Sequence, residues 1–261
     1  MTLSRYFMTE NNYSLSPDER LDYINEDLSL IQLKRGLTFG TDAYLLAAFV
    51  KERSGRGADL GSGTGVASLL CLTKNKSSYM YAAEIQTYYA DLIERNARLN
   101  SLSDRLSVFS GDVRSFSAKD TEGELDFVIS NPPYMKAEGG FGTKSEEMNI
   151  ARRELNGTID DFCNTAARLL KYGGLFYCVY RPDRLIDLIC ALRNANLEPK
   201  KLLTVYPDSS SVPCLVLCEA KKGAKGAVTM SKPLIIYKDG TREYTEEMQK
   251  IYDTCSLEHL F

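Results

Sequence analysis

Asn131, Pro132, Pro133 and Tyr134 form the stretch of this chain with the clearest chemical capacity. The amide oxygen of Asn131 and the backbone carbonyl of Pro132 are two acceptors, which could together bind both hydrogens of an amino group. Tyr134 adds a flat ring on which a nucleobase could stack, a contact worth roughly 1–3 kcal/mol, or against which a planar amide could lie. A simple turn at the end of a strand would use the same residue types, so the neighbouring elements must decide between the two interpretations.

The apolar run before this corner predicts the element that positions it. Val128 and Ile129 indicate a buried strand, and the two prolines prevent its backbone from continuing as a strand beyond Asn131. In an α/β sheet, ligands bind at the carboxyl ends of the parallel strands. The sequence therefore places the polar corner at the edge of the sheet where ligands bind.

A glycine-rich turn from Ala58 to Val66 predicts a cofactor site, with Asp59, Gly61, Ser62, Gly63 and Gly65 as its candidate contacts. Glycines at the junction of a strand and a helix permit positive φ and a close approach of the backbone to a ligand. A dinucleotide fingerprint would require a third glycine where this chain has Val66. Asp59 also suits a cation better than a pyrophosphate, so the turn favours S-adenosylmethionine, which carries a sulfonium and an ammonium and no phosphate.

Two more acidic residues follow predicted strands. The strand 79–83 ends at Glu84, about nineteen residues after the glycine turn, where an acid suits the two hydroxyls of a ribose. The strand 106–110 is followed by Asp112, which could accept a hydrogen bond from the exocyclic amine of an adenine. An aspartate that simply caps the next turn would fit Asp112 equally well.

The four strands that end near Asp59, Glu84, Asp112 and Asn131 alternate with predicted helices. This order predicts an α/β fold with a doubly wound, mostly parallel, Rossmann-like sheet. Two later strands, 202–206 and 212–220, predict an antiparallel hairpin at the C-terminal edge of that sheet. We divide the chain into three parts: an N-terminal extension of residues 1–30, a main domain of residues 31–220 and a basic C-terminal extension of residues 221–261.

Local signals also predict where some helices begin. Ser16-Pro17-Asp18-Glu19 is typical of a helix start. Thr41 or Asp42 could cap a helix over residues 43–50, and a final helix is expected to begin near Thr245.

The net charge limits how this protein could bind a nucleic acid. A formal net charge of −3 argues against a uniformly basic nucleic-acid coat, so contacts to RNA phosphates would come from local clusters. The candidates are Lys221, Lys222 and Lys225, together with Arg152 and Arg153 in the aperiodic segment 135–157, although most charge runs are merely solvated.

Cysteine and histidine usage gives no support for metal or disulfide chemistry. The seven cysteines include no Cys-x-x-Cys pair, and the single histidine gives no basis for histidine catalysis, so we expect no metal. Without a signal peptide, lipidation motif or apolar run of membrane length, we expect a cytoplasmic protein that does not enter a membrane.

The motifs together resemble those of class I S-adenosylmethionine-dependent methyltransferases that modify nitrogen, over about residues 32–220. The residues that carry this likeness are the glycine turn, Glu84, Asp112 and the Asn-Pro-Pro-Tyr corner, which is its most specific part. The segments 34–47, 206–226 and 233–245 resemble the bacterial family that methylates N6 of an adenine beside the anticodon of a valine tRNA.

The resemblance implies roles for individual residues. Asn131, the Pro132 carbonyl and Tyr134 would form the catalytic corner that holds the adenine and its amino group, and tRNA would be the partner. The cofactor would be S-adenosylmethionine, bound by the glycine turn, Glu84, Asp112 and Asn131, with Asp59 near its ammonium. Thr41 and Asp42 are further candidates at the same end of the cofactor.

Two other functions remain compatible with the residues. The corner fits a carboxamide as well as an adenine, so glutamine N5 methylation of a protein such as a release factor is an alternative. Only about thirty residues precede the likeness, whereas such enzymes usually carry a helical N-terminal domain. A non-catalytic RNA-binding module on the same fold is the other alternative, but such a module would not need Asn131.

Overall fold

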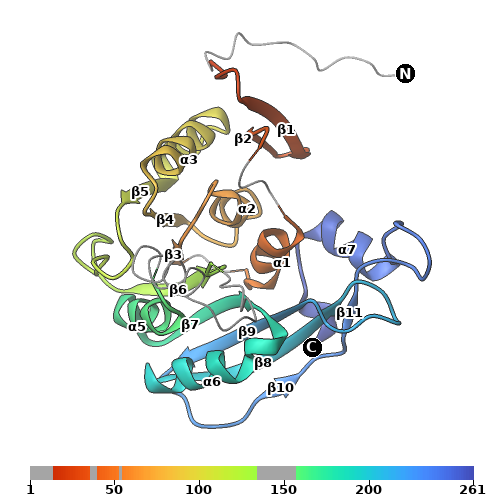
Figure 1. The fold of residues 1–261 in the computed structure, drawn as a ribbon. Helices are drawn as coiled ribbons and strands as arrows, with labels where there is room; N and C mark the ends of the chain where they lie inside the picture. The colour runs from red at the N-terminus through yellow and green to blue at the C-terminus, as the bar shows by residue number, and fades with distance from the viewer. Residues whose placement is uncertain (1–13, 36–39, 53–54, 134–156) are drawn as a thin grey trace, which may run out of the picture.

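The computed structural model describes residues 14–35, 40–52, 55–133 and 157–261 (Figure 1). A central sheet is covered by helices on both faces. The strands of this sheet are β3 (Arg56–Leu60), β4 (Tyr79–Glu84), β5 (Leu106–Ser110), β6 (Leu125–Ser130), β7 (Leu170–Tyr180), β8 (Leu197–Tyr206), β9 (Leu215–Lys222), β10 (Thr229–Met230) and β11 (Leu234–Ile235). The α-helices are α1 (Thr41–Phe49), α2 (Val66–Thr73), α3 (Thr87–Leu99), α5 (Ile159–Leu169), α6 (Leu185–Asn194) and α7 (Glu246–Thr254). Short 3₁₀ turns lie at Ser103–Arg105, Pro182–Arg184 and Glu258–Leu260.

The strand order in the central sheet is β10-β8-β9-β7-β6-β3-β4-β5, and β11 pairs with β8. The pairs among β3, β4, β5, β6 and β7 are parallel, whereas β9 runs antiparallel to both β7 and β8. The predicted fold class is therefore confirmed, including the antiparallel hairpin. It follows that β3, β4, β5 and β6 all end at one edge of the sheet, which we call the carboxyl edge.

Each face of the sheet has its own hydrophobic core. Helices α1, α2, α3 and α7 bury apolar side chains on one face, and α5 and α6 do so on the other (Figure 1). Residues along a strand alternate between the two cores: in β6, for example, Phe127 and Ile129 belong to the first and Val128 to the second. Because both faces are covered, the strands read as continuous apolar runs, as expected for a parallel sheet.

The N-terminal residues form a β-hairpin, which corrects the predicted helix start at Ser16. Strands β1 (Glu19–Asn25) and β2 (Leu28–Leu33) pair antiparallel and pack against α3. The backbone N–H of Glu19 donates to the carbonyl of Ser16 over 2.9 Å, which closes a four-residue turn with proline at its second position. A helix start and such a turn use the same residue types, and here the packing of β2 against α3 selects the turn.

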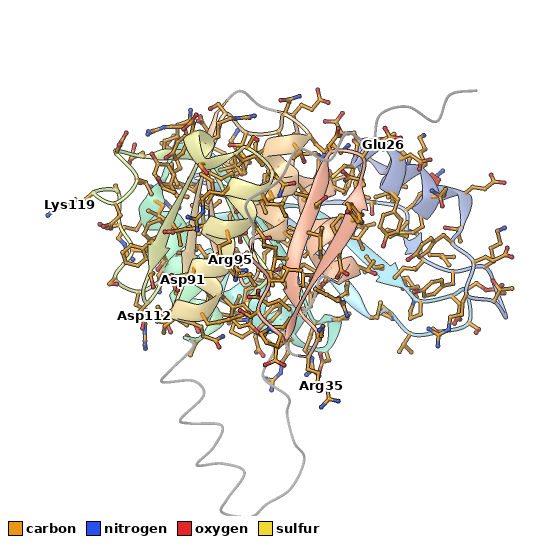
Figure 2. All side chains as sticks on the ribbon, turned by 90° about the horizontal axis from the view of Figure 1, so that it is seen from above. Glu26, Arg35, Asp91, Arg95, Asp112 and Lys119 are labelled. Atoms are coloured by element: carbon orange, nitrogen blue, oxygen red, sulfur yellow. The ribbon has the colours of Figure 1, made fainter. Side chains whose placement is uncertain are left out.

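A partly buried ion pair fixes the hairpin on α3. The Arg95 guanidinium donates to both carboxylate oxygens of Glu19, over 2.6 and 2.8 Å, and lies between the helix and the hairpin (Figure 2). The Glu19 side chain is fully buried, and its hydrogen bond from Arg95 is the main reason that its pKa falls to about 2. This contact joins residues that are far apart in the sequence, so local patterns do not reveal it.

The residues after position 220 pack into the main core. Met248 and Ile251 of α7 are fully buried in the same cluster as α1 and α2, and α7 begins after Thr245 as predicted, with the Thr245 hydroxyl accepting from the Met248 N–H. The strands β10 and β11 extend the central sheet beside β8. The division at residue 220 stays a prediction, because the packing itself shows no break there.

Candidate active site

Three glycines shape the turn between β3 and α2. Gly61, Gly63 and Gly65 have φ values of +72°, +55° and +80°, in the left-handed region that favours glycine. At Gly65 a Cβ atom would also lie 3.0 Å from two side-chain carbons of Ile93. At Gly63 a Cβ would meet no atom of the described residues within 4 Å, so among them this backbone faces open space. The turn therefore has the conformation that was predicted for a cofactor loop.

Asp59 is a buried acid at the end of β3. Its side chain is 2% exposed, and one carboxylate oxygen accepts from the Ser68 hydroxyl over 3.0 Å. Burial raises the pKa of Asp59 from an ordinary 3.8 to about 7, with the neighbouring charge of Glu84 contributing in the same direction. A buried carboxylate with such a pKa is stabilised by a cation. Asp59 is therefore suited to an ammonium group, as its sequence position suggested.

Glu84 supports the glycine turn from the end of β4. One carboxylate oxygen accepts from the Gly63 N–H and the other from the Gln86 N–H, each over 2.9 Å. Burial raises the pKa of Glu84, and these two backbone hydrogen bonds oppose the rise. Each oxygen retains a second lone pair, so both could still accept a ligand hydroxyl. The ribose contact stays a prediction, now beside a structural role in holding the turn.

Asp112 follows β5 and is paired with its neighbour. Its carboxylate accepts three hydrogen bonds from the Arg114 guanidinium: Nε donates to Oδ1 over 3.0 Å and to Oδ2 over 2.9 Å, and Nη2 donates to Oδ2 over 2.5 Å. The hydrogen bonds from Arg114 lower the pKa of Asp112. A contact from Asp112 to an adenine amine stays a prediction, because a ligand would have to share this carboxylate with Arg114.

Two apolar residues in the same region had not been predicted. Ile85 directly follows Glu84, Val113 directly follows Asp112, and both line the cavity described below. Apolar side chains next to strand-end acids could contact the faces of a flat heterocycle while the acids bind its polar groups. The signal in the sequence was the repeated pattern of an acid followed by a branched apolar residue.

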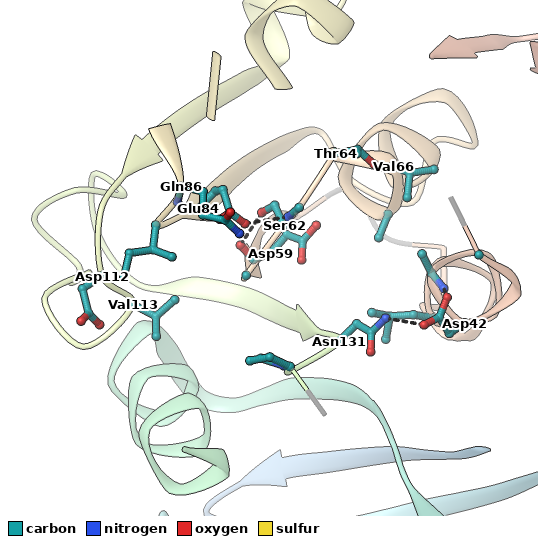
Figure 3. A pocket seen from close by; sticks show the side chains of 18 residues that line it. Asp42, Asp59, Ser62, Thr64, Val66, Glu84, Gln86, Asp112, Val113 and Asn131 are labelled. Atoms are coloured by element: carbon teal, nitrogen blue, oxygen red, sulfur yellow. Dashed lines mark hydrogen bonds between the residues drawn. The ribbon is translucent and has the colours of Figure 1, made fainter. Parts of the chain in front are cut away.

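Asn131 meets Asp42 at the end of β6. Its Nδ2 donates to Oδ2 of Asp42 over 2.8 Å (Figure 3). Its Oδ1 is buried and, within the described parts of the chain, accepts no hydrogen bond. Asp42 and Thr41 do not cap α1 as predicted: the N-cap residue is Gly40, which has no side chain to cap the helix. The Asp42 carboxylate instead accepts from Asn131 and from the Ala43 N–H.

A cavity of about 260 Å³ brings most of the predicted residues together at the carboxyl edge (Figure 3). Its size is near the lower end of the roughly 300–1,000 Å³ found for small-molecule sites. The predicted residues that line it are Asp42, Asp59, Gly61, Ser62, Gly63, Glu84, Asp112 and Asn131, with Pro133 beside them. Gly65 shapes the turn, whereas Pro132 and Thr41 are not among the lining residues. Tyr134, Arg152 and Arg153 lie outside the described residues.

The predicted lysine contacts lie elsewhere. Lys221 is paired with Leu175 of β7, and Lys222 donates to the carbonyl of Leu170 at the start of β7. Because β9 runs against its neighbours, its end lies at the edge of the sheet opposite to Asn131. Lys225 follows in the same exposed segment. The structure therefore does not bring these three lysines to the cavity, and their contact with RNA stays a prediction.

Neither a metal cluster nor a membrane-spanning helix is found within residues 14–35, 40–52, 55–133 and 157–261. No group of three or more histidine, cysteine, aspartate or glutamate side chains in those ranges is arranged to hold a metal ion. No helix there is both long enough and apolar enough to span a membrane.

Three relatives among the curated proteins are each named tRNA1(Val) (adenine(37)-N6)-methyltransferase. The protein from Flavobacteriaceae bacterium (strain 3519-10) is 25% identical over 197 residues, covering 69% of this chain and 81% of its own. That from Bacteroides fragilis is 28% identical over 181 residues, covering 69% and 75%. That from Actinobacillus pleuropneumoniae is 25% identical over 221 residues, covering 84% and 89%.

Solved structures share the fold. A predicted O-methyltransferase from Agrobacterium tumefaciens superposes with a TM-score of 0.67 at 24% identity, covering 83% of this chain and 97% of its own. TYW2 of M. jannaschii, in complex with AdoMet, superposes with a TM-score of 0.55 at 14% identity, covering 80% of this chain and 88% of its own.

A family model described as "Methyltransferase small domain" matches residues 34–187, which include the glycine turn, all four strand ends and Asn131. The chain therefore belongs to the methyltransferase small domain family.

Proposed function

We propose that this protein transfers a methyl group from S-adenosylmethionine to N6 of an adenine in tRNA, in the anticodon loop of tRNA(Val). The observation that carries the proposal is the buried oxygen of Asn131, which has no partner among the described residues and lies beside the cavity formed by the glycine turn. The relatives named as tRNA1(Val) adenine-N6 methyltransferases support the choice of tRNA and of adenine. A protein that acts on tRNA would work in the cytoplasm, which is the address we propose.

The residues of the cavity fit the cofactor. S-adenosylmethionine supplies, when bound, an electrophilic methyl group on a sulfonium. Asp59 would hold its ammonium, since a nearby cation compensates for a buried carboxylate. The open backbone at Gly63 would allow close approach, Glu84 would accept from the ribose, and Ile85 and Val113 would contact the adenine ring.

The substrate adenine needs help because its exocyclic nitrogen is a weak nucleophile, with its lone pair spread into the ring. The Oδ1 of Asn131 and the carbonyl of Pro132 would accept its two hydrogens and turn the lone pair out of the plane of the base. Such positioning by fixed polar groups accounts for large rate effects in enzymes. Tyr134 would stack on the base. An adenine in a loop can leave its stack at lower cost than one in a duplex, which suits the anticodon loop.

A bound tRNA is large enough to extend beyond the cavity. Lys221, Lys222 and Lys225 could then meet only a part of the RNA that is distant from the target base. Arg152 and Arg153 complete the set of phosphate contacts that we propose from the sequence.

The proposal is tested by incubating the protein with isotopically labelled S-adenosylmethionine and either total tRNA or release factor. We expect label in tRNA, recovered as N6-methyladenosine by nucleoside mass spectrometry. Asn131→Ala should lower transfer by about 100-fold or more, as loss of one fixed polar contact in a transition state does, and leave cofactor affinity within a few-fold. Asn164→Ala, on the exposed face of α5, is the matched control and should retain full activity.

Label in the release factor alone would reject the tRNA proposal in favour of glutamine methylation. No label in either substrate, with normal cofactor binding, would instead favour a non-catalytic module. Loss of cofactor binding in Asn131→Ala would show that the corner contacts the cofactor rather than the substrate amine.

A further inference from the structure

The two ends of an asparagine amide are nearly alike in shape and opposite in chemistry. One end donates hydrogen bonds and the other accepts them. Asn131 can serve a substrate amino group only if its oxygen, and not its nitrogen, is the end left available. In the structure its Nδ2 is used by Asp42, and its Oδ1 has no partner within the described residues.

Asp42 dictates this orientation because a carboxylate oxygen only accepts. We propose that Asp42 is a positioning residue that locks the Asn131 amide with its oxygen free for the substrate, an inference that rests on the methyl transfer proposed above. The hydrogen bond joins the first turn of α1 to the end of β6 across 89 positions of sequence, over 2.8 Å. Asp42 thus acts on the substrate amine through Asn131 and does not itself bind it.

The Asp42 carboxylate is itself held in place. Its Oδ1 accepts from the Ala43 N–H over 2.9 Å, while Oδ2 accepts from Asn131. Gly40 leaves room for this arrangement, since a Cβ there would lie 2.6 Å from Oδ1 of Asp42. The two oxygens therefore have separate partners, and both partners are donors.

Two simpler roles for Asp42 leave this arrangement unexplained. An acid in the first turn of a helix is favoured by the helix dipole, but that effect needs no contact with β6. A contact to the cofactor, which the resemblance implied, would not require that Asp42 receive the nitrogen of Asn131. The observed pair accounts both for the orientation of the amide and for an oxygen that accepts no hydrogen bond from the described residues.

The proposal predicts that the isosteric change is more harmful than truncation. In Asp42→Asn the new side chain has one oxygen, which the Ala43 N–H requires, so its NH₂ group faces Asn131. The Asn131 amide must then turn over and present Nδ2 to the substrate, so that two donors oppose each other. In Asp42→Ala nothing selects either orientation, and the productive one remains populated.

Single-turnover and steady-state methylation of tRNA test this order. We expect kcat to fall about 10-fold in Asp42→Ala and about 100-fold in Asp42→Asn, the size of effect seen when one fixed polar group is lost from a transition state. Cofactor Kd and thermal unfolding should stay near the wild-type values in both. Asp91→Asn, the same change at an exposed site on α3, should have no effect (Figure 2). In an Asn131→Ala background, Asp42→Asn should add nothing further.

Equal or milder loss in Asp42→Asn than in Asp42→Ala would overturn the proposal. So would a parallel loss of cofactor affinity, which would make Asp42 a cofactor contact, or a further loss in the Asn131→Ala background. A second readout does not need activity: the side-chain NH₂ resonances of Asn131, identified by their absence in Asn131→Ala, should shift in both Asp42 variants. If the wild-type protein fails to methylate tRNA, the proposed function is refuted, whereas unshifted resonances refute the role of Asp42.

Discussion

The buried carboxylate of Asp59 predicts an unusual dependence of stability on pH in the ligand-free protein. Its pKa rises from an ordinary 3.8 to about 7 because the folded protein withholds water from the charge. Between these two pH values the unfolded chain releases the proton and the folded protein keeps it. Unfolding therefore becomes easier as the pH rises, and the loss of stability is complete once Asp59 ionises in the folded state, above pH 7.

The size of the effect follows from the same two pKa values. One pKa unit corresponds to about 1.4 kcal/mol, so ionised and buried Asp59 lowers the free energy of unfolding by about 4 kcal/mol relative to strongly acidic solution. About 2–3 kcal/mol of this loss falls between pH 5 and pH 8. Asp59→Asn keeps an acceptor for the Ser68 hydroxyl and has no charge to bury. The variant should therefore lack this loss and be more stable than the wild type at pH 8.

Urea unfolding followed by circular dichroism, at pH 5 and pH 8, measures the difference. The change in unfolding free energy between the two pH values is compared between the wild type and Asp59→Asn. Contributions from other groups that titrate alike in both proteins cancel in this comparison. Asp91→Asn should match the wild type. Equal pH dependence in wild type and Asp59→Asn would refute the reasoning about burial.

Asp59→Asn should have the opposite effect on cofactor binding: it raises the stability of the free protein but lowers its affinity for the cofactor. A cofactor ammonium beside Asp59 favours the ionised carboxylate, so binding near pH 7 should release protons, seen by calorimetry in buffers of different ionisation enthalpy. Asp59→Asn should weaken cofactor binding by about 10-fold or more, since a charge-assisted contact is lost. If Asp59→Asn is both more stable and a poorer binder, the Asp59 charge destabilises the free protein but strengthens cofactor binding.

Two further substitutions test the scaffold of the site. Gly65→Ala places a side chain at φ +80° and 3.0 Å from Ile93. We therefore expect the unfolding free energy to fall by about 1–2 kcal/mol and cofactor binding to weaken. An unchanged denaturation midpoint would contradict the strained geometry. Glu19→Gln breaks the partly buried pair with Arg95 and should cost about 2–3 kcal/mol at pH 7. Because the folded-state pKa of Glu19 is lowered from 4.5 to about 2, the wild-type advantage should fade as the pH drops through that range, and an advantage that persists at pH 2 would rule out ionisation as its source.

Local sequence patterns predicted much of the fold because the parallel core repeats one unit, an apolar strand with a polar residue at its end followed by a helix. The strands predicted to end at Glu84 and at residue 110 have those ends in the structure. Apolar runs and strand-end polar residues are local features, and the covering of both faces of a parallel sheet favours the apolar runs in its central strands. Glycines at positive φ complete the pattern at the first turn.

What the sequence could not predict depends on contacts between distant residues. The hairpin of β1 and β2 is stabilised by α3, and the pair of Glu19 with Arg95 spans 76 positions. The bond of Asn131 to Asp42 spans 89. In each case a polar residue has a plausible local role, as a helix start or a cap, and its partner becomes visible only when the elements are packed.

Strand direction alone shows that Lys221, Lys222 and Lys225 lie far from Asn131. Each parallel strand of this sheet delivers its next loop to the carboxyl edge, which is why Asp59, Glu84, Asp112 and Asn131 converge. Two strands of a hairpin run in opposite directions, so only one of β8 and β9 can end at that edge. Since β8 runs parallel to β7, the end of β9 and the lysines after it must lie at the other edge. If RNA binds at Asn131 as proposed, we therefore expect its contacts near the target base to come from the carboxyl edge and not from the lysines at the end of β9.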